Sequence, residues 1–379
     1  MKRVLIVTTS YPDQNEGKAA AGVFVRDFAI ALKDKGISVA LVAPALHSSE
    51  TIEDGIRVTR FRVPRLPLSL LNPVNPLDWL SIATTLYKGV YIVDHTCAIE
   101  RPDFIFAFWA LPSGFWAKVS ANKYDIPYGI WSLGSDIWTL GRIPGIRGYL
   151  RHVLRDAAYR FSDGYQLAED VQSISGKPCH FLPSSRRFFL DFKRQVSSAP
   201  PFRLAFLGRW HTNKGIDLLL EALTCLNRRA WEKVDLIRIH GGGPLEALVH
   251  QKVDELASSG RPVEYGGYLD LQGAQALFAW ADFVLIPSRI ESIPVVFSDA
   301  MQAECPVIVT PVGDLPSLVT GLHCGEVAER VHAIEFSEAI KKAICATPGK
   351  YCDGVRVAAE QFRVDSSVGL FLKVVDHGE

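Results

Sequence analysis

The sequence has no net charge and no long run of charges of one sign. Its 379 residues include 41 Lys and Arg side chains against 41 Asp and Glu side chains. A nucleic-acid partner is therefore disfavoured, because such partners select a concentrated excess of cations. The densest basic stretch, RVTRFRVPR at residues 57–65, alternates along a strand. We interpret it as a solvated face rather than a binding patch.

Three further features are scarce. The seven cysteines are scattered singly, without a CxxC pair or a Cys/His spacing typical of zinc, so we expect reduced thiols and no metal site. No run of 18 apolar residues occurs, and the apolar run near the N-terminus is too short for the core of a signal peptide. These absences predict a cytoplasmic chain, with peripheral contact at the inner face of the membrane left open.

Short β-branched runs alternate with helical patterns through most of the chain. A length of 379 residues exceeds what one hydrophobic core usually supports, so two domains are expected. The alternation is typical of βαβ units in a parallel sheet. The first series comprises strands at 3–9, 38–44, 103–108 and 128–134 and helices at 22–36 and 147–161.

A polar stretch with two prolines, residues 191–201, interrupts the alternation as linkers do. A second series follows, with strands at 202–209, 234–243, 283–288 and 306–311 and helices at 215–227, 244–257 and 294–303. We therefore predict an α/β protein with two facing Rossmann-like domains, residues 1–193 and 202–354. Ligands should bind in the cleft at the carboxyl ends of their strands.

Residues 66–92 break the pattern with prolines and an amphipathic stretch. An ordinary packed insertion is the simpler interpretation. A loop that binds the acceptor, or a helix that contacts a membrane, is the alternative.

The stretch FLGRWHTNKG, residues 206–215, ends a strand and begins a helix with Arg209 and Lys214 on the connecting loop. The N–H groups and dipole of a helix N-terminus favour an anion, and two cations add to that preference. The pattern predicts a phosphate site. The alternative is a pair of surface cations.

Glycines follow the next strand, in IHGGGPLEALV at residues 239–249. They let the backbone approach a ligand at Gly243, or simply make a tight turn. They are not a dinucleotide fingerprint, because Glu246 stands where the third glycine would be required. The loop after the first strand is also too long for that fingerprint, although Gly22 at its end could let a helix N-terminus approach a phosphate.

Two carboxylates flank an apolar run in IPSRIESIPVVFSDAM, residues 286–301. Glu291 should lie in a loop after a buried strand, and Asp299 in the helix that begins near Pro294. Ionised carboxylates accept hydrogen bonds, which suits them to the vicinal hydroxyls of a sugar or ribose. Alternatively, Glu291 complements the helix dipole and Asp299 lies on a solvated face or in a salt bridge.

Together, GRWHTNKG, HGGGPLEALV and the stretch from residue 287 to 319 resemble the nucleotide-sugar domain of retaining GT-B glycosyltransferases of family 4, the glycosyl transferase group 1. The resemblance implies that Arg209 and Lys214 hold the donor diphosphate and that Glu291 holds the donor sugar. It assigns sugar and phosphate contacts to the backbone of Ile293, Pro294 and Val295. Asp299 replaces the family's second glutamate, so contact with the ribose would need a helix shift or a bridging water.

The N-terminal half resembles the family from Gly22 to the GSD segment at residues 134–136. Leu133, Phe106 and Phe108 stand where many relatives have histidines. Asp136 is interpreted as a polar group at the cleft or as a helix cap. The resemblance also implies that the C-terminal helix, residues 355–379, returns to the first domain.

The resemblance implies a retaining, metal-independent hexosyltransferase that uses a nucleotide-diphosphate sugar and no other cofactor. Its acceptor would be a saccharide or a lipid-linked saccharide, in the synthesis of cell-surface polysaccharide or glycoconjugate. Tyr265 and Tyr268 are candidates to flank the base, or core residues. One alternative is a sugar-nucleotide epimerase. The other is a non-catalytic relative that binds a nucleotide sugar or a partner enzyme, and Leu133 and Asp299 favour this second alternative.

Overall fold

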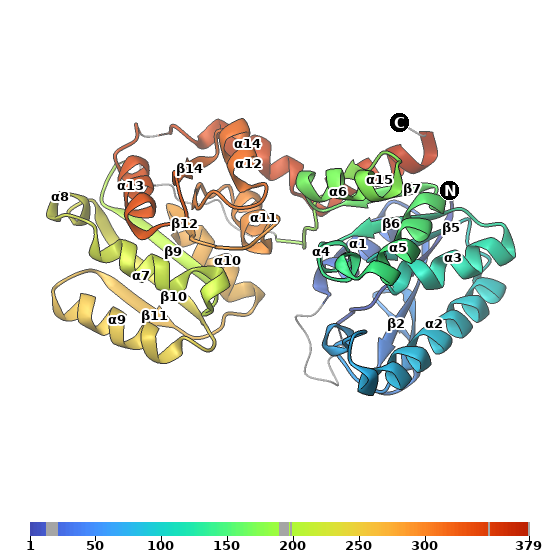
Figure 1. The fold of residues 1–379 in the computed structure, drawn as a ribbon. Helices are drawn as coiled ribbons and strands as arrows, with labels where there is room; N and C mark the ends of the chain where they lie inside the picture. The colour runs from blue at the N-terminus through green and yellow to red at the C-terminus, as the bar shows by residue number, and fades with distance from the viewer. Residues whose placement is uncertain (13–21, 189–196, 198, 348, 378–379) are drawn as a thin grey trace. The chain divides into compact units, whose positions relative to one another are not determined.

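The chain forms two compact units in a computed structural model that describes all residues except 13–21, 189–196, 198, 348, 378 and 379. Unit 1 comprises Met1–Arg186 and Val364–Glu379, and unit 2 comprises Arg187–Arg363 (Figure 1). Each unit is built on its own sheet. Most of the predicted linker, residues 191–196 and 198, lies outside the described residues.

The sheet of unit 1 has the strand order β3-β4-β2-β1-β5-β6-β7-β8. Only β3 and β4 pair antiparallel, and the other neighbours are parallel. The central strands β1, β5 and β6 are buried along nearly their whole length because helices cover both faces. The strands are β1 (Arg3–Val7), β2 (Ser38–Ala45), β3 (Ser49–Glu53), β4 (Ile56–Arg62), β5 (Phe104–Phe108), β6 (Tyr128–Ser132), β7 (Tyr159–Ser162) and β8 (His180–Phe181).

Helices α2, α3, α5 and α6 share one hydrophobic core with this sheet, and α1 and α15 share a second core on its other face. In that second core the ring of Phe371 on α15 lies 4.5 Å from that of Phe106 on β5. The helices of unit 1 are α1 (Val23–Asp34), α2 (Trp79–Glu100), α3 (Ser113–Tyr124), α4 (Ser135–Trp138), α5 (Pro144–Asp156), α6 (Tyr165–Ser175) and α15 (Val364–His377).

Unit 2 has a six-stranded parallel sheet in the order β11-β10-β9-β12-β13-β14. Its strands are β9 (Phe202–Arg209), β10 (Val234–Gly242), β11 (Val263–Gly266), β12 (Phe283–Ile286), β13 (Val307–Val309) and β14 (Gly325–Val327). Its helices are α7 (Ile216–Thr224), α8 (Arg228–Trp231), α9 (Glu246–Ser258), α10 (Leu271–Trp280), α11 (Val295–Gln302), α12 (Leu315–Leu322), α13 (Ala333–Ile344) and α14 (Cys352–Gln361).

Some predicted bounds differ from those in the structure. The helix expected at 147–161 ends at Asp156, and the last residues of that range form β7, because pairing with β6 outweighs local helix propensity. The C-terminal segment expected from residue 355 starts later, since α14 belongs to unit 2 and the chain enters unit 1 at Val364.

The basic strand is also not a uniformly solvated face. Arg60 on β4 is only 7% exposed, and its guanidinium pairs with Glu53 on the antiparallel neighbour β3. The same guanidinium donates to the carbonyl of Pro12 at 2.9 Å. Arg57 and Arg62 on the same strand are exposed as predicted.

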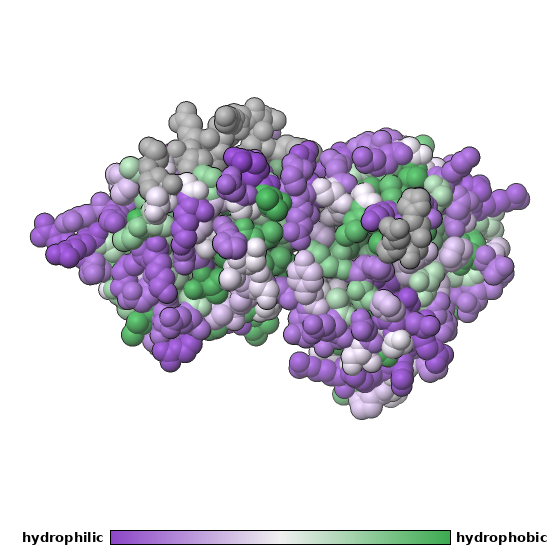
Figure 2. Space-filling view, turned by 90° about the horizontal axis from the view of Figure 1, so that it is seen from above, coloured by the Kyte–Doolittle hydropathy of each residue, from purple (hydrophilic) through white to green (hydrophobic). Residues whose placement is uncertain are grey.

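None of the described helices, α2 with its 22 residues included, is long and apolar enough to cross a membrane. Space-filling colours show hydrophilic residues over much of the face drawn in Figure 2, with apolar residues scattered among them.

Candidate functional site

The candidate site of unit 2 lies where the strand order of its sheet reverses. From β9 the chain proceeds to β10 and β11 on one side, then returns to β12 on the other. Loops from the carboxyl ends of β9 and β12 therefore diverge at this point, which is where open α/β sheets bind ligands. Arg209 ends β9, Lys214 ends a short 3₁₀ turn (Thr212–Lys214), and Glu291 follows β12.

Lys214 and Glu291 are direct partners. The ammonium group of Lys214 forms an ion pair with Oε1 of Glu291, 77 residues along the chain. The Lys214 side chain is 39% exposed and the Glu291 side chain only 13%. Ser288 Oγ donates to the same carboxylate oxygen at 3.4 Å. The structure thus brings together two residues that the sequence assigned separately to phosphate and sugar.

Arg209 is an exposed cation at the same edge of the sheet. Its guanidinium makes no hydrogen bond or ion pair with any residue that the structure describes. The site therefore has one cation engaged with a carboxylate and another that is available to an anion from solution.

The glycine loop after β10 packs against the Arg209 segment. Trp210 N donates to Gly242 O at 2.8 Å, and Leu245 N donates to Trp210 O at 3.1 Å. A Cβ on Gly243, whose φ is +147°, would lie 2.8 Å from Trp210 O and 3.3 Å from Cγ of Arg209. Only glycine fits there without displacing the backbone of Trp210, so Gly243 keeps the loop close to the Arg209 segment.

Residues around the start of α11 differ in accessibility. Pro294 is the N-cap of the helix, and Phe297 N donates to its carbonyl at 2.9 Å. Ile293 is 8% exposed and Val295 is 44% exposed. Asp299 is only 1% exposed, so the structure does not present its carboxylate to solvent as it does part of Glu291. Contact between Asp299 and a ribose remains a prediction that requires a shift of α11 or a bridging water.

Arg289 was missed by sequence reasoning. Its Nη1 donates to Thr212 O at 2.8 Å and to Oδ1 of Asp217, on α7, at 2.7 Å. Its backbone N donates to Asn213 O at 2.8 Å. These bonds tie the Lys214 loop to the Glu291 loop. No local signal could have revealed them, because Arg289 and Asp217 are 72 residues apart.

Gly215 allows the two loops to touch. It has φ +70°, and a Cβ there would lie 1.8 Å from Pro287 O, at the end of β12. Gly313 likewise allows a close approach to Glu291, since a Cβ added at Gly313 would lie 2.2 Å from Glu291 O. The position of Glu291 therefore depends on close backbone contacts from two other loops.

Tyr265 on β11 and Tyr268 just after it contact α9 and the glycine loop. The ring of Tyr265 stacks on that of His250 with centroids 4.3 Å apart, and Tyr268 Oη donates to Gly242 O at 2.7 Å. Tyr268 is 71% exposed and Tyr265 is 38% exposed, so neither is a core residue.

In unit 1, Gly22 precedes α1 with φ +74°, and a Cβ there would lie 2.5 Å from Ser10 O. Gly22 thus holds the helix start against the segment that follows β1. Phe106 and Phe108 are fully buried in the second core, so neither takes the place of a polar site residue.

Asp136 holds two loops of unit 1 together. Its carboxylate, 1% exposed, accepts from Ala110 N at 2.6 Å and from Leu133 N at 3.2 Å. Burial raises the pKa of Asp136 to about 6, against the lowering effect of these backbone hydrogen bonds. Asp136 therefore links the chain after β5 to the chain after β6.

Among the described residues, no group of three or more His, Cys, Asp and Glu side chains is placed to hold a metal ion. The charged groups that converge at the unit 2 site are Arg209, Lys214, Glu291 and the Arg289–Asp217 pair.

The chain resembles known proteins in both sequence and fold. Residues 201–345 match the model of the family described as glycosyl transferases group 1. A teichuronic acid biosynthesis glycosyltransferase of Bacillus subtilis is 25% identical, with 90% of this chain and 88% of that protein covered. A D-inositol 3-phosphate glycosyltransferase of Xylanimonas cellulosilytica is 30% identical, with 98% of this chain and 95% of that protein covered.

Among solved structures, Anabaena Alr3699/HepE in complex with UDP superimposes with a TM-score of 0.70 at 15% identity, covering 99% of this chain and 100% of that one. At that identity the likeness concerns the fold alone. The chain therefore belongs to the glycosyl transferases group 1 family and has the GT-B fold.

Proposed function

We propose that the chain transfers a sugar from a nucleotide-diphosphate sugar to a saccharide or lipid-linked acceptor, with retention of anomeric configuration and without a metal ion. The observation that carries the proposal is the Lys214–Glu291 ion pair at the strand-order reversal of unit 2, where the exposed Arg209 also ends β9. Two cations beside one carboxylate suit a ligand that joins a diphosphate to a hydroxylated ring.

The cations would act on the leaving group. Negative charge grows on the diphosphate as its bond to the sugar breaks, and fixed cations stabilise that charge more than they stabilise the intact donor. Arg209 already has no partner among the residues that the structure describes, and Lys214 would exchange Glu291 for phosphate oxygens. The start of α7, two residues after Lys214, adds the favourable end of a helix dipole. These groups would take the part that metal ions take in other phosphate enzymes.

Retention requires the acceptor oxygen to attack the face that the diphosphate leaves. The bond from the anomeric carbon to the phosphate oxygen breaks as the bond to the acceptor oxygen forms, with an oxocarbenium-like sugar between them. The acceptor proton passes to the departing phosphate oxygen, so no separate base is needed. Glu291, released from Lys214, would accept hydrogen bonds from sugar hydroxyls.

The names of similar proteins support a hydroxyl-bearing acceptor and a nucleotide-sugar donor. One relative is assigned to teichuronic acid biosynthesis and another to glycosylation of inositol 3-phosphate, and a structural neighbour was solved with UDP. We extend this to synthesis of a cell-surface glycoconjugate by a chain that contacts the membrane peripherally.

A thermal-shift screen against UDP, GDP, ADP and their sugar derivatives tests the donor site. We expect one nucleotide to raise the melting temperature of the wild type, and Arg209→Ala and Lys214→Ala to abolish that shift. Arg228→Ala, which removes a side chain 89% exposed on α8 of the same unit, is the control and should keep the full shift. Absence of stabilisation by any nucleotide would overturn the proposal.

The mechanism needs a second measurement. With the donor identified, transfer should proceed in EDTA, and NMR of the product should show the donor's anomeric configuration. Inversion, or complete dependence on added Mg²⁺ or Mn²⁺, would refute the mechanism while leaving the donor site intact.

A further inference from the structure

We propose that unit 1 docks on an anionic lipid bilayer through an apolar ridge formed by Leu70, Val74, Leu77, Trp79 and Leu80. The ridge begins in the turns before α2 and continues onto the first residues of that helix. The inference rests on the proposed function in one respect, because an enzyme with a lipid-linked acceptor has to meet that acceptor at a membrane. Its physical basis is independent of the donor site.

Exposure is concentrated in this ridge. Leu77 is 88% exposed, Leu80 80%, Val74 68%, Trp79 58% and Leu70 52%. In the described part of the chain, 22 large apolar side chains are exposed, and eight of them fall between residues 70 and 99. Single exposed apolar residues are ordinary on soluble proteins, but a contiguous group marks a contact surface.

The outer face of α2 is more apolar than that of a helix on a water-facing surface. Its buried face mixes polar and small residues with apolar ones, among them Thr85, Gly89 and Val93, while its outer face carries Tyr87 and Tyr91 at 74% and 62% exposure. A surface helix normally turns apolar residues inward and polar residues outward. The outer face of α2 therefore has the composition expected of a helix that meets an apolar phase.

Small residues explain how the inner face still packs. A Cβ on Gly89 would lie 2.2 Å from the ring of Trp116 on α3, so α2 approaches α3 closely. The hydroxyl of Thr85 and the indole N–H of Trp116 are buried there without a hydrogen-bond partner in the described part of the chain. Val93 and Cys97 fill the apolar part of this side, and the larger aromatic side chains of α2 lie on the outer side.

The backbone of the ridge is already hydrogen-bonded within itself. Asn72 N donates to Asp78 at 2.9 Å, Val74 N to Asn72 Oδ1 at 3.0 Å, and Leu77 N to Asn75 Oδ1 at 3.2 Å. Trp79 Nε1 donates to Pro73 O at 2.8 Å. Groups satisfied in this way lose little on leaving water, so the ridge can enter the headgroup region without unfolding.

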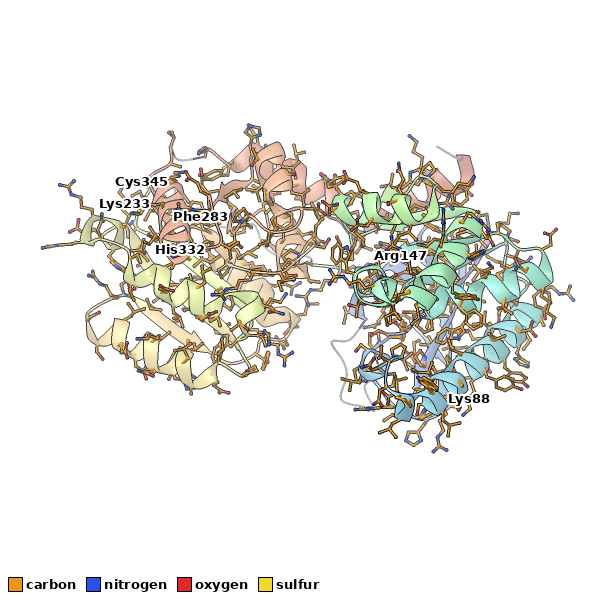
Figure 3. All side chains as sticks on the ribbon, in the orientation of Figure 1. Lys88, Arg147, Lys233, Phe283, His332 and Cys345 are labelled. Carbon is orange, nitrogen blue, oxygen red and sulfur yellow. The ribbon has the colours of Figure 1, made fainter. Side chains whose placement is uncertain are left out.

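Charge beside the ridge selects an anionic bilayer. Arg62 and Arg65 are exposed, and neither pairs with a carboxylate among the described residues. Lys88 lies on α2, labelled in Figure 3, and donates to Arg62 O at 3.2 Å. Asp78 is the sole acid between residues 66 and 93, and its carboxylate accepts a hydrogen bond from Asn72 N. Cations beside exposed Trp, Tyr and Leu are the recognised composition of a membrane-interface surface.

A second copy of the chain fits this surface less well. A two-fold contact would place the ridge against itself and bring two sets of these cations together with hardly any acid to pair them. A bilayer that contains anionic headgroups can take up the apolar side chains and also pair with the cations.

The test is co-sedimentation of the full chain with vesicles of phosphatidylcholine, with and without phosphatidylglycerol. We expect binding to the anionic vesicles and little to the neutral ones. Leu77→Asn/Leu80→Asn should lower the partition coefficient by about tenfold or more, because two apolar side chains no longer leave water. Arg62→Gln/Arg65→Gln should weaken binding to anionic vesicles only.

Ile52→Asn is the matched control, since Ile52 is 76% exposed on β3 of the same unit and lies outside the ridge. It should bind vesicles like the wild type. All variants should keep the nucleotide-induced thermal shift, which separates failure of this inference from failure of the donor site. The inference falls if the wild type does not bind vesicles or if the leucine variant binds equally well. It also falls if the leucine variant instead dissociates a dimer.

Discussion

The ammonium group of Lys214 and the carboxylate of Glu291 neutralise one another at the edge where β9 and β12 diverge. A diphosphate can reach this lysine only by competing with Glu291. A sugar attached to that diphosphate would restore a partner to the released carboxylate. Binding of a complete donor would thus exchange one ion pair for two sets of contacts, whereas a free nucleoside diphosphate would leave Glu291 without a replacement.

Glu291→Gln should therefore separate the two ligands. We expect the variant to bind the free nucleoside diphosphate at least as tightly as the wild type, because Lys214 is no longer held. Its affinity for the nucleotide sugar should fall by about tenfold, since a weaker acceptor faces the sugar. Isothermal titration of both ligands measures this, with Glu246→Gln, an exposed acid on α9, as control. Equal loss of both affinities would show that Glu291 only positions Lys214.

Arg289 should matter more for affinity than for stability. Its pair with Asp217 is about one-third exposed on both sides, so we expect a loss of only about 1 kcal/mol of unfolding free energy in Arg289→Met. Because the same guanidinium joins the two loops of the site, nucleotide affinity should fall by about three- to tenfold.

A double-mutant cycle checks this assignment. Asp217→Asn should reproduce part of the loss in affinity, and Arg289→Met/Asp217→Asn should be no worse than Arg289→Met. Additive losses in calorimetric titrations would mean that the two residues act independently and that the pair does not couple the loops.

Gly215 and Gly260 offer a matched comparison. Both have positive φ, +70° and +77°, but a Cβ on Gly215 would meet Pro287 O at 1.8 Å, whereas a Cβ on Gly260 would have nothing within 4 Å. Gly260→Ala should cost about 1–2 kcal/mol of unfolding free energy from backbone strain alone. Gly215→Ala should cost about 2–3 kcal/mol more, because the loops must separate. Urea unfolding measures both, and equal losses would exclude the close loop contact.

Local patterns in the sequence were enough to predict much of this site. The apolar run that ends at Gly208 and Arg209 predicted a strand followed by a cationic loop, and β9 ends at Arg209. Pro294 predicted the start of α11 to within a residue. These predictions succeed because turn residues and helix starts are determined by neighbours in the chain.

Contacts between distant segments were not predictable in this way. The Lys214–Glu291 and Arg289–Asp217 pairs depend on the reversal of strand order, which no local pattern records. The burial of Asp299 depends on how α11 packs, and helical spacing alone allowed an exposed face. The outward apolar face of α2 could not be predicted for a similar reason, since the pattern of an apolar segment does not determine which of its faces packs against the sheet.

Asp136 should give unit 1 a measurable pH dependence. Burial raises its pKa to about 6, whereas an unfolded aspartate titrates near its ordinary value of about 4. Between these values the folded chain holds a proton that the unfolded chain has released, so the free energy of unfolding falls as pH rises from about 4 to 6. Below that range both states are protonated, and above it the loss is complete. The shift corresponds to a decrease of at most about 3 kcal/mol.

Asp136→Asn removes this titration. The unfolding free energy of the wild type minus that of the variant should therefore decrease from pH 4 to pH 7, by up to the same about 3 kcal/mol. Urea unfolding at each pH measures the difference, and Asp125→Asn, at an exposed position of the same unit, controls for the lost charge. A difference that grows with pH would mean that Ala110 N and Leu133 N stabilise the ionised carboxylate more than burial opposes it. Asp136 would then hold its two loops together most strongly when it is charged.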